Sequence, residues 1–160
     1  MIAGLSIADF TLLHVVISLI GIVSGLVALF PLIGNRMPAW MTVLFLASTV
    51  LTSVTGFMFP GAGIDPAKVV GAISLVALAI AILALYGRRL AGIARPVYVV
   101  AATLALYLNC FVAVVQAFQK VPFLQAMAPT QSEPPFLVAQ LVVLALFIAL
   151  GYRAVRRFRP

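Results

Sequence analysis

Long apolar runs alternate with short polar breaks along this chain. The breaks fall at NRMP, FPGAGIDP, GRRLAGIARP and a proline-rich stretch after Lys120, and they delimit five apolar segments at residues 9–33, 38–59, 66–87, 96–119 and 135–154. Each segment has the roughly 20 residues that a helix needs to cross the hydrocarbon layer of a bilayer. The pattern predicts a single all-α domain over residues 1–160, a polytopic membrane helix bundle with five transmembrane helices.

Helix start signals agree with this division. Pro38, Pro66 and Pro96 stand where first helical turns would begin, because a proline there loses no hydrogen bond. Asp65 is a good N-cap residue before Pro66. Residues 121–130, between the fourth and fifth segments, are too few to span a bilayer. Their apolar side chains predict a short helix in the membrane interface that would cover one end of the bundle.

Charge is distributed unequally between the two sides of such a bundle. Lys68 and Lys120 fall on one side with the three acidic residues, whereas the other side collects eight arginines: Arg36, Arg88, Arg89, Arg95, Arg153, Arg156, Arg157 and Arg159. Because cytoplasmic loops accumulate Lys and Arg, we expect the N-terminus outside and the C-terminus cytoplasmic. The expected location is the bacterial cytoplasmic (inner) membrane. We interpret the arginines of residues 153–159 as topology anchors; the alternative is a patch for anionic lipid headgroups.

The composition supports the assignment to a membrane and therefore affects how the net positive charge of the chain is interpreted. The chain is 65% hydrophobic and 8% charged, against roughly a quarter charged in a soluble domain. A net charge of +7 would point to nucleic acid in a soluble protein, but here it marks topology, so no nucleic-acid partner is expected. The expected partners are membrane lipids, together with subunits of a larger membrane complex or further copies of this chain.

Polar residues within the apolar segments gather toward the expected outer side. At 3.6 residues per turn, Asn109, Gln116 and Lys120 share one face of the fourth helix. Because polar groups in hydrocarbon are costly unless paired or hydrated, this one-sided distribution predicts an outward-facing pocket beneath the interfacial segment. The predicted ligand-binding residues are His14, Ser18, Thr52, Thr55, Asn109, Gln116, Lys120, Glu133 and Gln140.

The first segment also carries a packing signal. Gly21 and Gly25 form a small-xxx-small pair, which allows another helix to approach closely. For His14 the simpler interpretation is a hydrogen bond to a Thr or Gln of another helix, and amides and hydroxyls also join membrane helices in this way. A ligand pocket and interhelical packing therefore remain two alternatives for the same polar residues.

Catalytic and metal-binding chemistry are poorly represented in the sequence. No nucleophile, base and orienting group occur at motif spacing, so we expect no enzyme. Three carboxylates, one histidine and one cysteine are too few for a metal site. Haem is not favoured as a cofactor, because a haem site in a helical bundle normally takes two strong axial ligands and this chain has only His14.

The expected function is binding of a lipid, a quinone or another amphipathic small molecule, either alone or as an accessory subunit of a larger membrane complex. A small transporter or channel is the main alternative, although the cytoplasmic half offers few polar groups for a continuous path. A haem or redox membrane subunit is the third. In length and span count the chain resembles the translocator protein family, five-helix membrane proteins that bind porphyrin and sterol-like ligands. The Trp-Pro motifs of that family do not occur here, where Trp40 is the one tryptophan, so the resemblance assigns no residue.

Overall fold

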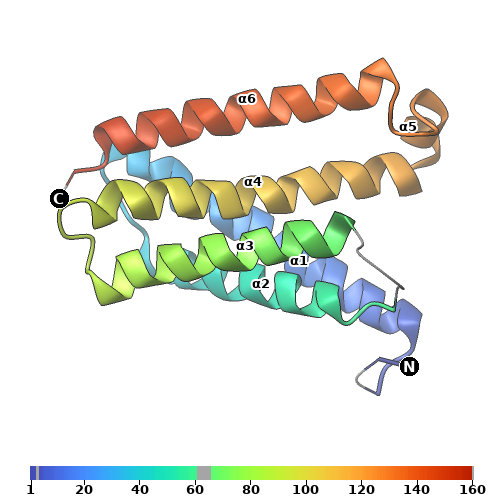
Figure 1. The fold of residues 1–160 in the computed structure, drawn as a ribbon, viewed down its shortest axis with the longest axis horizontal. Helices are drawn as coiled ribbons and strands as arrows, with labels where there is room; N and C mark the ends of the chain where they lie inside the picture. The colour runs from blue at the N-terminus through green and yellow to red at the C-terminus, as the bar shows by residue number, and fades with distance from the viewer. Residues whose placement is uncertain (3, 61–65, 160) are drawn as a thin grey trace.

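The computed structural model describes residues 1–2, 4–60 and 66–159 of the chain, which are helical over most of their length (Figure 1). The helices are α1 (Ile7–Leu29), α2 (Ala39–Phe57), α3 (Pro66–Ile82), α4 (Ala94–Lys120), α5 (Pro122–Met127) and α6 (Pro134–Arg157). A 3-10 turn, η1 (Phe30–Gly34), follows α1, and a π-helical turn, η2 (Leu83–Gly87), follows α3. The expected N-cap at Asp65 lies outside the described residues.

Five helical stretches are long and apolar enough to cross a membrane: Ile7–Gly34, Ala39–Phe57, Pro66–Gly87, Ala94–Lys120 and Pro134–Arg157. They coincide with the five expected segments, so the expected all-α, five-span architecture is confirmed in the described part of the chain. The short helix α5 lies within the expected interfacial segment. α4 begins at Ala94, slightly before the expected start. Pro96 is then the third helical residue, where a missing N–H removes no intrahelical hydrogen bond.

Consecutive long helices run in opposite directions (Figure 1). The N-terminus, α5 and the start of α6 lie at one end of the bundle, called here the N-terminal end. The C-terminus, η1 and the connection between α3 and α4 lie at the other, the C-terminal end. All eight arginines therefore belong to the C-terminal end, whereas Lys68 and Lys120 belong to the N-terminal end.

The apolar core occupies the half of the bundle toward the C-terminal end. α4 lies at its centre, in contact with α1, α3 and α6. The large, fully buried apolar side chains of this core are Leu29, Leu32, Phe45, Leu78, Tyr98, Val99 and Leu106. Phe158, just after α6, joins the same cluster. Apolar side chains therefore make up most of the buried interior of this half of the bundle.

α6 is the least enclosed of the long helices. It packs along α4 and against η1, and only Gln140 and Ala154 of its residues are buried. Its C-terminal end is held by the chain that follows, because the backbone N–H of Arg159 donates to Asn35 Oδ1 at 2.8 Å. Most of the α6 surface faces the surroundings of the bundle rather than its interior.

Candidate functional site

The buried residues toward the N-terminal end are largely polar, in contrast to the apolar core at the other end. They come from α2, α3, α4 and α6, from mid-bundle outward, and comprise Ser48, Thr49, Ser53, Ser74, Asn109 and Gln140. A buried polar atom in a membrane protein needs a partner, because hydrocarbon offers none. The hydrogen bonds of these and the neighbouring polar side chains therefore show which of them remain available for a ligand.

His14 bonds across to α2. Its Nδ1 atom lies 2.7 Å from the hydroxyl oxygen of Thr55, and that hydroxyl donates to the Leu51 carbonyl at 2.7 Å. With the single Thr55 hydrogen directed at the Leu51 carbonyl, the hydroxyl accepts from His14; in this tautomer the ring proton is on Nδ1 and Nε2 is an acceptor. Nε2 makes no hydrogen bond with any described residue. The imidazole also meets the Phe59 ring edge to face, with centroids 5.2 Å apart.

Asn109 and Ser18 extend this connection to α4. Asn109 Nδ2 donates to the Ser18 carbonyl at 3.4 Å, and the Ser18 hydroxyl donates to the His14 carbonyl at 2.8 Å. The structure thus brings four of the predicted site residues into one connected group across α1, α2 and α4: His14, Ser18, Thr55 and Asn109. The hydrogen bonds within this group join two helices or stay within one helix, as expected of interhelical packing.

The close approach expected at Gly21 and Gly25 is confirmed. A Cβ atom added to Gly21 would lie 3.1 Å from Asn109 Nδ2 and 3.1 Å from Thr49 Oγ1. One added to Gly25 would lie only 2.8 Å from a ring carbon of Phe45. The two glycines thereby let α2 and α4 pack directly against the backbone of α1.

Besides Gln140, whose Oε1 atom is buried without a partner among the described residues, three further predicted residues retain uncommitted polar groups. The hydroxyl of Thr52, one turn before Thr55 on α2, is buried without a hydrogen-bond partner among the described residues. Gln116 is half-buried, and its amide has no hydrogen bond in the part of the chain that the structure describes. Lys120 is exposed in the last turn of α4, on the same face of that helix as Gln116. These groups have no hydrogen-bond partner among the described residues.

Gln140 and Glu133 have other roles. Gln140 Nε2 donates to the Phe111 carbonyl at 3.2 Å, which fastens α6 to α4. Glu133 accepts from the Thr130 hydroxyl at 2.8 Å and from the N–H groups of Thr130 and Ser132 at 3.2 and 3.1 Å. No ion pair joins Glu133 to Lys120 in the described structure, so the carboxylate stabilises its own turn.

The electrostatics of Glu133 agree with this role. Desolvation acts to raise the pKa of its carboxyl, but the hydrogen bonds from the Thr130 hydroxyl and the backbone N–H groups outweigh it and lower the pKa below its usual range. The carboxylate is therefore ionised at neutral pH. It fixes the turn between α5 and α6.

Sequence reasoning missed Gln131 as a contact between the loop and α4. Its Nε2 donates to the Val115 carbonyl at 2.8 Å, and its Oε1 accepts from Gln119 at 3.4 Å. Nothing in the stretch TQSEPP distinguishes this glutamine from a solvated one, because the partner carbonyl lies sixteen residues away on another helix. The loop is thus tied to the C-terminal part of α4, at the N-terminal end of the bundle and beside the predicted site.

Together, the five long apolar helices and the polar residues enclosed between them define the class of this protein: an integral membrane helix bundle. Comparison of the chain with protein-family models, with curated proteins and with solved structures found no match. The assignment of site residues therefore rests on the geometry alone.

Proposed function

We propose that this protein binds a hydroxyl-bearing amphipathic molecule, of the lipid or quinol class, in the N-terminal half of the bundle. The observation that carries the proposal is that Nε2 of His14 makes no hydrogen bond with a described residue; this nitrogen is an acceptor when Nδ1 carries the ring proton. A ligand hydroxyl can donate to this nitrogen and can accept from an uncommitted donor such as Thr52 or Gln116. The chemistry needed is a hydrogen-bonding headgroup.

The surroundings of His14 support an amphipathic rather than a fully polar ligand. Phe10 and Phe59 stack edge to face beside the imidazole, and the outward side of α1 carries exposed apolar residues such as Leu13. A molecule that reaches Nε2 therefore places its apolar part against aromatic rings and lipid. With the N-terminal end facing outward, as the arginine distribution favours, the site belongs to the outer leaflet of the bacterial cytoplasmic membrane.

The apolar core favours binding over transport. A transporter or channel needs a polar path or alternating access through the whole bundle. The C-terminal half is instead filled by fully buried side chains such as Leu29, Phe45 and Leu106. Buried polar residues of that half, such as Ser24 and Thr42, donate to backbone carbonyls of their own helices and form no continuous path among the described residues, which suits a binding pocket that is open on one side.

Native mass spectrometry of the gently purified protein tests this proposal. We expect a co-purified lipid or quinol, and a variant His14→Phe should lose it, since phenylalanine keeps the ring but has no acceptor nitrogen. The matched control is Leu13→Phe, which adds a ring next to position 14 on the outward side of α1. Equal retention of the ligand by both variants would contradict the proposal.

The same spectra separate the proposed forms of this function. A protein that co-purifies at fixed stoichiometry would identify an accessory subunit, and a second copy of the chain a homo-oligomer. A Soret absorption band in the same sample would instead identify haem and replace the proposed ligand. Transport activity in proteoliposomes that disappears in His14→Phe would favour the transporter.

A further inference from the structure

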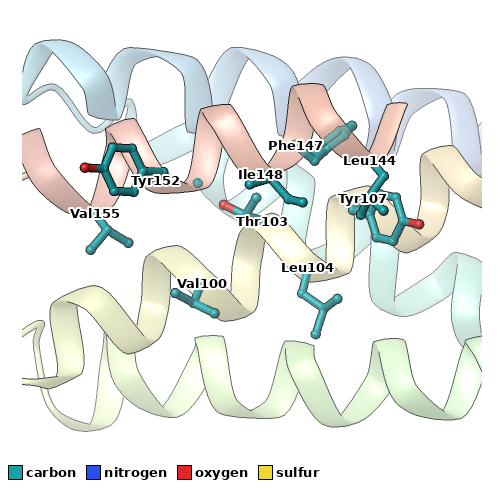
Figure 2. A pocket seen from close by; sticks show the side chains of 10 residues that line it. Val100, Thr103, Leu104, Tyr107, Leu144, Phe147, Ile148, Tyr152 and Val155 are labelled. Carbon is teal, nitrogen blue, oxygen red and sulfur yellow. The ribbon is translucent and has the colours of Figure 1, made fainter. Parts of the chain in front are cut away.

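A groove of about 470 Å³ lies between α4 and α6 in the C-terminal half of the bundle. Figure 2 shows the side chains that line it. Val100, Leu104 and Tyr107 of α4 form one wall, and residues from Leu144 to Val155 of α6 form the other. Eleven residue steps of α6 correspond to about 16 Å along the helix axis. This length is close to half of the roughly 30 Å hydrocarbon layer, so the groove matches the depth of one leaflet.

One end of the groove meets uncompensated positive charge. Tyr152 lines the groove, and the guanidinium carbon of Arg156 lies 5.7 Å from the centre of its ring. Arg153 and Arg157 are exposed beside it. The acidic residues that the structure describes, Asp9 and Glu133, both lie at the N-terminal end of the bundle and cannot neutralise this cluster.

Inside the groove lies a donor without a partner. The hydroxyl oxygen of Thr103 is buried and has no hydrogen bond to any described residue, and the residue is 7% exposed. Figure 2 shows Thr103 between α4 and α6, with its oxygen turned toward the Tyr152 end. It faces Gly151, since a Cβ atom on that glycine would lie 3.3 Å from Thr103 Cγ2. The glycine therefore lets Thr103 lie close to α6, with its hydroxyl oxygen buried in the inner wall of the groove.

We propose that this groove binds an anionic phospholipid from the leaflet at the C-terminal end. One acyl chain lies along the apolar walls, the phosphate lies at Arg156, and the ester carbonyl just below the phosphate accepts from the Thr103 hydroxyl. Positive charge at the mouth selects an anionic headgroup. A second copy of this chain fits poorly, because a copy with the same membrane orientation would bring its own arginines against these.

Lipid titration with native mass spectrometry tests the headgroup preference. The probes are phosphatidylglycerol and phosphatidylcholine with identical palmitoyl and oleoyl chains, added to delipidated protein in detergent. We expect one phosphatidylglycerol to bind in preference to phosphatidylcholine and to raise the melting temperature. Equal binding of the two lipids would overturn the proposal.

Two tryptophan variants test whether the groove is the site. Ile148→Trp fills the groove from a position that is 62% exposed, whereas Leu146→Trp places the same side chain on α6 outside the groove, at a position that is 64% exposed. We expect Ile148→Trp alone to lose the preference for phosphatidylglycerol, with both variants melting like the wild type without lipid. Loss of the preference in both, or in neither, would refute the groove as the site. A change of oligomeric state in Ile148→Trp with lipid binding intact would assign the groove to a protein contact instead.

Two polar substitutions test the headgroup contacts. Arg156→Gln should weaken phosphatidylglycerol binding about 5-fold, the effect of one basic residue near an anionic surface, and more than its neighbour Arg157→Gln. Thr103→Val keeps the shape of the side chain and removes the donor, and it should weaken binding about 2-fold to 10-fold. Equal effects of the two arginine variants would show only general attraction to charge, and an unchanged affinity in Thr103→Val would exclude the ester contact.

Discussion

A Cβ atom added to Gly21 would lie 3.1 Å from Nδ2 of Asn109, so the glycine of α1 and the amide of α4 occupy adjacent space in the middle of the bundle. The same amide donates to the carbonyl of Ser18, one turn before Gly21 on α1. The absence of a side chain at position 21 therefore allows a polar side chain of α4 to reach the backbone of α1. Helix packing and the position of the polar group depend on each other here.

Alanine at the glycines of α1 should destabilise the bundle in a defined order. Gly25→Ala should cost about 1 to 3 kcal/mol, since its methyl group would overlap the buried side chains of Leu106 and Phe45 at 2.6 and 2.8 Å. Gly21→Ala should cost less, because the nearest atoms there are 3.1 Å away. Gly34→Ala is the control, with no atom within 4 Å. Unfolding in detergent measures the order, and a Gly34→Ala variant as unstable as Gly25→Ala would contradict it.

Gln116 and Thr55 should separate ligand binding from packing. Gln116→Leu should melt like the wild type and weaken binding of the co-purified ligand about 2-fold to 10-fold, because its amide makes no hydrogen bond with a described residue. Thr55→Val should lower the stability of the ligand-free protein by about 1 kcal/mol, because Nδ1 of His14 loses its acceptor. Melting curves with and without ligand measure both. A Gln116→Leu protein that melts early yet binds normally would assign Gln116 to packing.

Membrane orientation should follow the arginines. In a Cys110→Ala background, which removes the one native thiol, a cysteine at Arg89 should react with a membrane-impermeant maleimide only after the membrane is opened. A cysteine at the exposed Gln125 of α5 should react in intact cells. These outcomes place the C-terminal end in the cytoplasm, and the reverse pattern would invert the proposed topology.

Acidification should release the turn between α5 and α6. The folded-state pKa of Glu133 is lowered, so its carboxylate stabilises the fold at pH values above its unfolded pKa of about 4.3, and this contribution is lost as pH falls through the lower folded value. The melting-temperature difference between the wild type and Glu133→Gln should therefore be present at pH 7 and diminish below about pH 4. Subtracting the variant removes the effects of other titrating groups. A difference that is constant with pH would exclude this role.

The sequence by itself determined the features that depend on neighbouring residues along the chain. The five spans follow from the length of the apolar runs, and the grouping of eight arginines at one end follows from the alternating direction of five short-linked helices. The close approach at Gly21 and Gly25 was equally readable, because two small residues one turn apart leave a gap on any helix. Such features require no knowledge of which helices meet.

Only the tertiary structure decided which side chains meet, because the crossing and rotation of the helices select each partner. The sequence assigned His14, Gln140 and Glu133 to one predicted site on the outer side. In the structure, His14 instead bonds to Thr55 and Gln140 to the Phe111 carbonyl, and Glu133 bonds to Thr130 in the turn before α6. The groove between α4 and α6 likewise depends on how far apart these two helices lie, which no local pattern in either sequence segment records. A shift of one residue in either helix would change its walls, since side chains on neighbouring positions point about 100° apart.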